Sequence, residues 1–135
     1  MMRFACLLIL LAISCADGSN TKRPVELGQE FDLRIGETAS ITAERYYVGF
    51  SSVTEDSRCP EGVDCIWAGN AVVRASISKV NGRQESVDLN TGLEPKEKLN
   101  GGYRLRLVRL RPYPKKDETI GKKDYVATFV VSKEN

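Results

Sequence analysis

Residues 71–77 read Ala71-Val-Val-Arg-Ala-Ser-Ile77, and the dipeptide Asn81-Gly82 follows shortly afterwards. Apolar side chains stand at positions 71, 73, 75 and 77, which is the two-residue period of a strand with one buried face. An Asn-Gly pair between two such segments is a strong signal for a hairpin turn. Residues 84–89 supply the returning segment, so this stretch predicts an antiparallel β-hairpin.

Similar strand-like segments lie on both sides of this hairpin. They are Phe31–Ile35, Ala39–Ala43, Tyr46–Phe50, Tyr103–Val108 and Tyr125–Val131. Helical periodicity is not sustained anywhere, and residues 94–99 are expected to form a helical turn at most. Several short strands separated by turns predict an all-β fold, a single antiparallel β-sandwich of the immunoglobulin-like kind. A small, partly open β-barrel is the alternative.

The segment that begins at Tyr103 changes phase along its length. Leu105 and Leu107 share one face, but Leu110 returns to that face only if one residue is inserted. We therefore expect a β-bulge near Val108. Pairing should end at Pro112-Tyr-Pro114, because neither proline can donate a ladder hydrogen bond.

Length and composition narrow the possible functions. The chain has 135 residues, 41% of them hydrophobic and 28% charged, which indicates one globular domain. Its net charge of +2 is too small for a dedicated nucleic-acid-binding protein. The absence of histidine removes the commonest general base and most zinc sites, so we expect no cofactor and no metal.

The N-terminal residues read as an export signal. Arg3 precedes an apolar run, Phe4–Ile13, that is too short to span a bilayer, so residues 1–14 are predicted to be a signal peptide. The run ends at Leu11-Ala-Ile-Ser-Cys15, which resembles the bacterial lipobox. That resemblance implies a lipidated Cys15, a membrane anchor in the cell envelope and, because Ala16 follows, the outer membrane. An ordinary secretory signal is the alternative.

Residues 15–26 are polar and contain Gly18 and Pro24, so we expect a flexible tether there and a β-sandwich domain over 27–135. Once Cys6 leaves with the signal and Cys15 carries lipid, Cys59 and Cys65 remain as an even pair in an oxidising compartment. Only five residues separate them, including Pro60 and Gly62, which predicts a structural disulfide across a tight loop.

The sequence around this loop resembles a known family. The string Asp56-Ser-Arg-Cys-Pro, continuing through Val63-Asp-Cys-Ile-Trp-Ala-Gly-Asn-Ala71, is similar to a motif of small, largely uncharacterised bacterial exported proteins and lipoproteins. Later segments, Leu110–Pro114 and Tyr125–Val131, extend the resemblance over most of the chain. The resemblance implies the fold and the compartment, and it implies no particular activity.

Several residues are candidates for a binding surface. Trp67 is expected to pack in the core against the disulfide, and the alternative is an exposed contact residue at a loop tip. A basic strand face followed by Tyr113 could meet an anionic glycan or lipid headgroups, or it could be an ordinary solvated face. The arginines of this face are Arg104, Arg106, Arg109 and Arg111. The carboxylates Glu55, Asp56, Glu61 and Asp64 are expected to be solvated or paired with Arg58 rather than to bind calcium.

These observations favour a non-catalytic envelope lipoprotein that binds an envelope protein or a glycan. A first alternative is a protease inhibitor, because three segments are similar to the inhibitory loops of chagasin-like proteins. They are Asp88–Gly92, Asn100–Gly102 and Arg111–Tyr113. A second alternative is a small hydrolase that uses paired carboxylates such as Glu55, Asp56 or Asp64.

Overall fold

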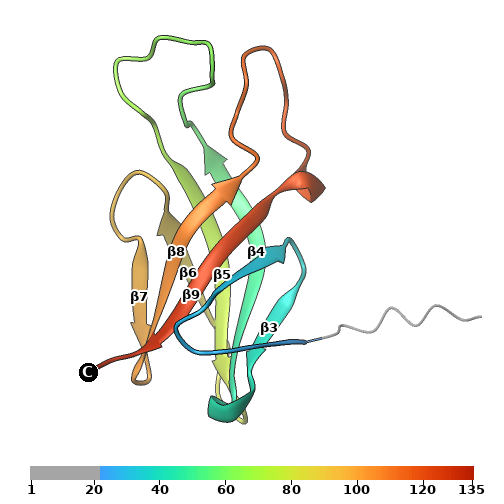
Figure 1. Ribbon diagram of the computed structural model, residues 1–135, viewed down its shortest axis with the longest axis vertical. Coiled ribbons are helices and arrows are strands. Elements are labelled where there is room, and N and C mark those ends of the chain that lie inside the picture. Colours follow the sequence, from blue (N-terminus) through green and yellow to red (C-terminus); the bar gives the residue numbers. More distant parts are fainter. Residues whose placement is uncertain (1–21) are drawn as a thin grey trace, which may run out of the picture.

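The computed structural model describes residues 22–135, which form two β-sheets packed face to face (Figure 1). The five-stranded sheet has the order β1-β3-β4-β5-β6 and the four-stranded sheet has the order β2-β9-β8-β7. The first consists of β1 (Arg23–Val25), β3 (Thr38–Ile41), β4 (Tyr46–Asp56), β5 (Ala71–Lys79) and β6 (Glu85–Asn90). The second consists of β2 (Glu30–Arg34), β9 (Val126–Lys133), β8 (Tyr103–Arg111) and β7 (Glu97–Asn100).

The all-β sandwich is confirmed, and the sheets stay open rather than closing into a barrel. Within residues 22–135 the only helical segments are two 3₁₀ turns, Thr42–Glu44 and Lys122–Asp124. The strand order differs from that of an immunoglobulin domain, in which strands A, B, E and D form one sheet and C, F and G the other, so that the chain crosses between the sheets three times after strand B. Here β3 to β6 follow one another in one sheet, and β7 to β9 follow one another in the other.

The predicted hairpin over residues 71–89 is the pairing of β5 with β6. The four alternating residues Ala71, Val73, Ala75 and Ile77 are all buried. Asn81 adopts a φ of 60° in the turn, a conformation that asparagine tolerates better than most residues. The antiparallel register runs from Val72 opposite Asn90 to Ile77 opposite Glu85.

The predicted bulge in β8 is also present. The register of β8 against β9 shifts between Leu107 and Arg109, and Leu110 is buried on the same face as Leu105 and Leu107. The strand ends at Arg111, directly before Pro112, because proline has no backbone N–H to donate to the ladder.

Two segments depart from expectation. Residues 97–99, expected to lie in at most a helical turn, belong to β7 (Glu97–Asn100), because pairing with β8 outweighs the local preference. Residues 23–25, expected to belong to the tether, form β1, which pairs in parallel with β3. The folded domain therefore begins before residue 27, and Arg23 also donates a hydrogen bond to the carbonyl of Asp32.

The core lies between the sheets and is centred on Phe129. The Phe129 ring centroid is 6.1 Å from that of Phe31 in β2 and 6.2 Å from that of Phe50 in β4. A second aromatic pair, Tyr46 and Tyr103, has ring centroids 4.8 Å apart. The Phe31–Phe129 pair lies within the four-stranded sheet, whereas the Phe50–Phe129 and Tyr46–Tyr103 pairs join the two sheets.

Candidate functional site

Three loops gather at one end of the sandwich, and we call them together the loop end. They are the β4–β5 loop (57–70), the β6–β7 loop (91–96) and the β8–β9 loop (112–125). The first and the last extend beyond the ends of their strands, far from the point where the chain enters the domain (Figure 1). The loop end is therefore the part of the domain most available to a partner.

The two long loops are joined by backbone hydrogen bonds. The N–H of Glu61 donates to the carbonyl of Pro114 at 2.9 Å, and the N–H of Lys116 donates to the carbonyl of Glu61 at 3.2 Å. This isolated parallel bridge fixes the position of each loop relative to the other. The loops therefore present one continuous, ordered surface rather than two independent tips.

A disulfide closes the β4–β5 loop. The sulfur atoms of Cys59 and Cys65 are 2.07 Å apart and their Cα atoms 5.9 Å apart, which agrees with the predicted pair. The N–H of Cys59 also donates to the carbonyl of Ala68 at 2.8 Å, so the base of the loop is held as well. The segment between the cysteines is preorganised before any partner arrives.

Replacing Cys65 with serine should lower the free energy of unfolding by about 2 kcal/mol, the chain-entropy value for a loop of about seven residues. Urea denaturation of the two proteins under oxidising conditions measures the difference. In the presence of a reducing agent the two proteins should have nearly the same stability. An unchanged stability of the oxidised variant would contradict a structural role for the disulfide.

Arg58 is the buried centre of the loop end, with only 6% of the residue exposed. Its Nε and Nη2 donate to the two carboxylate oxygens of Asp56 at 2.8 and 2.7 Å. Its Nη1 donates to the carbonyl of Leu110 at 2.7 Å, and Nη2 also reaches the carbonyl of Pro112 at 3.0 Å. The guanidinium of Arg58 thus links the β4–β5 loop to the end of β8. The expected pairing of Arg58 with Asp56 is confirmed.

Tyr125 completes this network by donating its hydroxyl to Asp56 at 3.0 Å. Burial raises the pKa of Asp56, but the hydrogen bonds and charge of Arg58 outweigh it, so that the pKa lies below its ordinary value. Burial, together with the hydrogen bond to Asp56, raises the pKa of Tyr125 to about 12. Asp56 is therefore an ionised structural partner at neutral pH, which leaves it poorly suited to serve as a catalytic acid.

Asn70 attaches the β6–β7 loop to the same assembly. Its buried side chain donates to the side-chain oxygen of Asn90 at 2.8 Å and accepts from the N–H of Gly92 at 2.9 Å. A Cβ on Gly92 would lie only 2.4 Å from the carbonyl oxygen of Gly69, so these two loops touch at a place where only glycine fits. All three loops are thus held by specific contacts.

The loop end carries most of the exposed apolar residues. Of the six large hydrophobic side chains that are exposed within residues 22–135, five lie on these loops. They are Val63, Ile66, Trp67, Leu93 and Tyr113. The expectation that Trp67 packs in the core is wrong, because the residue is 57% exposed and the disulfide loop projects beyond the sheets. The alternative of an exposed contact residue fits the structure.

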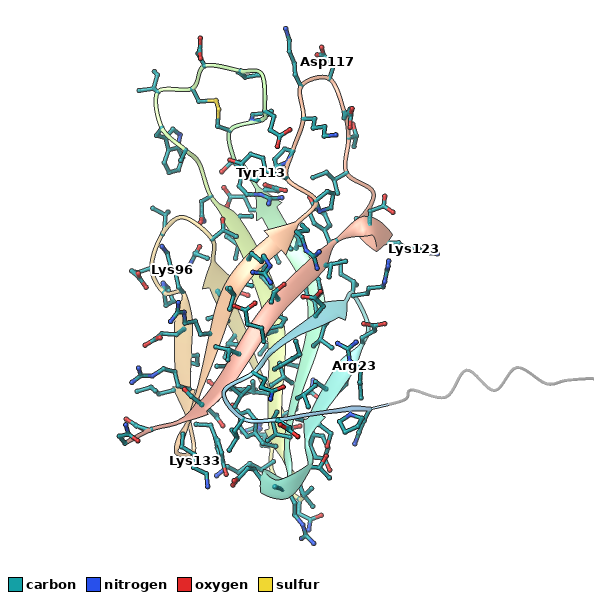
Figure 2. The ribbon with its side chains drawn as sticks, in the orientation of Figure 1. Arg23, Lys96, Tyr113, Asp117, Lys123 and Lys133 are labelled. Carbon is teal, nitrogen blue, oxygen red and sulfur yellow. A yellow bond between two sulfur atoms is a disulfide. The ribbon has the colours of Figure 1, made fainter. Side chains whose placement is uncertain are left out.

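A hollow of about 260 Å³ lies between the three loops and the end of β8. Its lining includes Ala68, which follows Trp67, and Gly92, which precedes Leu93. Tyr113 forms another part of the wall, and Figure 2 shows it between the bases of the two long loops. The Arg58 guanidinium carbon lies 5.2 Å from the centroid of the Tyr113 ring, a cation–π contact that holds the ring.

The arginines of β8 lie on the outer face of the four-stranded sheet, and the last two of them, Arg109 and Arg111, approach the loop end. Arg109 pairs with Glu30 at 2.7 Å, and Arg111 pairs with Asp32 at 2.5 Å. Arg104 lies 3.5 Å from Glu97. The fourth member, Arg106, is exposed and lies opposite Glu97 in the β7–β8 register. Carboxylates from β2 and β7 thus pair with three of the four arginines of the predicted basic face.

The remaining predicted sites are separated by the fold. Asn90–Gly92 and Arg111–Tyr113 reach the loop end, but Asn100–Gly102 forms the β7–β8 turn at the opposite end, where Lys79 donates to the carbonyl of Gly101 at 2.7 Å. The chagasin-like segments therefore do not form one array. In the described part of the chain, no three potential metal ligands come together, although Glu61 and Asp64 lie on the same loop.

Sequence reasoning missed Ile66, Leu93 and Asn70 as members of the site. Asn70 stands in the quoted motif beside Gly69, and this Gly-Asn pair was a usable signal for a fixed loop. Leu93 stands between Gly92 and Glu94, and Ile66 stands between Cys65 and Trp67, so neither local sequence indicates that the side chain is exposed. Only the tertiary arrangement brings the loops that carry them to the same end of the sandwich as Trp67.

Comparisons with models of known protein families, with curated proteins and with solved structures produced no match to this chain. Residues 22–135 contain no helix with the length and apolar character needed to cross a membrane.

Proposed function

We propose that this chain is a non-catalytic, lipid-anchored protein of the bacterial cell envelope that binds a partner protein through its loop end. The observation that carries the proposal is the concentration of exposed apolar residues on three mutually fixed loops. Tryptophan and tyrosine are enriched among the residues that dominate the affinity of protein interfaces. Preorganised loops also lose less conformational entropy when they bind.

The net charge of the loop end favours a protein as the binding partner over a polyanion. Residues 57–70, 91–96 and 112–125 contain six basic and six acidic residues, so their net charge is zero. An anionic glycan, a nucleic acid or an acidic membrane surface would be attracted by an excess of positive charge. A mixed-charge border around aromatic and aliphatic residues is instead typical of a protein interface.

The compartment part of the proposal rests on the sequence around Cys15, which lies outside the described residues. The disulfide between Cys59 and Cys65 is compatible with an oxidising, exported location. A diacylglycerol with its additional acyl chain would anchor the protein firmly, because a single chain binds a membrane only marginally.

Metabolic labelling with a fatty-acid analogue should mark the full-length chain, and Cys15→Ala should abolish the label and release the protein from the membrane fraction. The physical reason is that the Cys15 sulfur is the atom that receives the diacylglycerol in a lipobox. Cys6→Ala serves as the matched control and should keep the label. Label that persists in the Cys15→Ala chain would rule out this anchor.

The binding function is tested by photo-crosslinking in the producing bacterium, with a photoreactive amino acid in place of Ile66. We expect a covalent protein adduct whose yield falls at least tenfold when Trp67→Ala is added, because truncation of a central aromatic residue typically costs about 2 kcal/mol or more. Leu99→Ala is the matched control, since Leu99 is exposed but lies on β7 outside the loops.

The same photoreactive residue at Gln84, in the exposed β5–β6 turn at the opposite end, should give no such adduct. An adduct from Ile66 that is insensitive to Trp67→Ala, or equally strong from Gln84, would contradict binding through the loop end. Complete absence of protein adducts from position 66 would contradict it as well.

A further inference from the structure

We propose that the hollow beside Tyr113 is the acceptor site for one large apolar side chain, preferably aromatic, projected by the partner protein. This inference rests on the proposed function, since it specifies how the loop end engages that partner. The hollow would receive one side chain of the partner. The exposed residues around the hollow would form the rest of the contact area.

The walls of the hollow come from every part of the loop end. Ala68 and Gly69 contribute from the β4–β5 loop, and Thr91 and Gly92 from the start of the β6–β7 loop. Val108 at the bulge and Tyr113 after β8 close the other side. Because each of these segments is held by the hydrogen bonds described above, the hollow exists before binding and needs no rearrangement to accept a group.

The charge of the hollow excludes an anionic guest. Two arginines, Arg58 and Arg109, contribute to its lining, and the guanidinium group of each is already paired. Asp56 and two carbonyl groups occupy the first, and Glu30 pairs with the second at 2.7 Å. A partner carboxylate would have to displace these internal partners, whereas an apolar group would only cover the guanidinium and phenol faces.

The size of the hollow suits a single side chain. A buried apolar cavity of about 150 Å³ binds benzene, and this hollow has a volume of about 260 Å³. Residues next to its lining, Trp67 and Leu93, are exposed and would surround the entering group with apolar surface. The hollow is open in the free protein, and a partner side chain that enters it would be desolvated on binding, as interface hot-spot residues are.

The inference is tested by NMR titration of the exported chain carrying Cys15→Ala with N-acetyltryptophan amide as the probe. We expect saturable shifts of the backbone amides of Ala68, Gly69 and Gly92, with a dissociation constant on the order of 1 mM for a probe of this size. N-acetylglutamate amide should bind at least tenfold more weakly.

Ala68→Phe places a ring at the mouth of the hollow and should weaken binding of N-acetyltryptophan amide at least tenfold. Ala43→Phe is the matched control, because Ala43 is exposed in the 3₁₀ turn outside the loop end, and it should leave the affinity unchanged. If Ala68→Phe disturbs the fold, Val108→Phe fills the same hollow from the strand side and should have the same effect.

Shifts confined to the groove beside Val25 and Ile41, or equal binding of the glutamate probe, would overturn the inference. The crosslinking assay separates it from the proposed function. If the adduct from position 66 depends on Trp67 but is unaffected by Ala68→Phe, the hollow is not an acceptor and the loop end remains a binding surface. If the probe binds in the hollow but the adduct does not depend on Trp67, the proposed function is wrong.

Discussion

Arg58→Ala should lower the free energy of unfolding by about 3–5 kcal/mol, the usual cost of removing one partner of a buried ion pair. The substitution leaves the Asp56 carboxylate buried with only the Tyr125 hydroxyl as a side-chain donor. It also leaves the carbonyls of Leu110 and Pro112 without the donor that now reaches them at 2.7 and 3.0 Å. Equilibrium urea denaturation of the Cys15→Ala chain, with and without Arg58→Ala, measures this difference.

The matched control is Arg74→Ala, which removes an ion pair of similar geometry from an exposed position. Arg74 Nε lies 2.8 Å from Asp88, but the two side chains are 46% and 43% exposed. Exposed pairs contribute about 0–1 kcal/mol, so this variant should stay close to the parent protein. If the two variants lost similar amounts of unfolding free energy, the burial of Arg58 would not determine its contribution to stability.

Phe129→Ala should lower the free energy of unfolding by about 3–5 kcal/mol, the range for deleting a buried phenylalanine side chain. Phe129 lies within about 6 Å of both Phe31 and Phe50, so its removal leaves a cavity where the sheets meet. The neighbouring strands are held in register by the ladders of β9 with β2 and β8, which limits how far they can collapse into the space. Thermal or urea unfolding detects the change.

Val130→Ala provides the comparison for this core substitution. Val130 is the next residue of β9 and faces away from the core, with part of its surface exposed. Its truncation should cost less than about 1 kcal/mol, as is usual for positions away from the core. If Phe129→Ala were no more harmful than Val130→Ala, the assignment of Phe129 to the centre of the core would be wrong.

Much of the fold could be predicted from local patterns. The alternation at Ala71, Val73, Ala75 and Ile77 requires one buried face, and a phase change before Leu110 requires an inserted residue. These features depend only on residues close in sequence. The same holds for the disulfide, because the five residues between the cysteines include a proline and a glycine and allow the chain to turn back on itself.

Features that depend on distant residues could not be predicted in this way. β7 exists because β8 offers it a partner, and β1 exists because β3 does, although neither segment has a strong strand pattern of its own. Trp67 was expected in the core because tryptophan usually buries its large surface. Its position depends on how far the disulfide loop projects, which is set by Arg58 and by the bridge between Glu61 and Lys115.

The parallel pairing of β1 with β3 has a mechanical consequence. A pull on the chain before residue 23 would load β1 first, which is held by the three pairs from Arg23 opposite Ala39 to Val25 opposite Ile41 and by the hydrogen bond from Arg23 to the Asp32 carbonyl. The next strand, β2, belongs to the other sheet and is held by five pairs with β9. Tension would therefore release a short length of slack and stop at β2, while the three loops at the far end keep their shape.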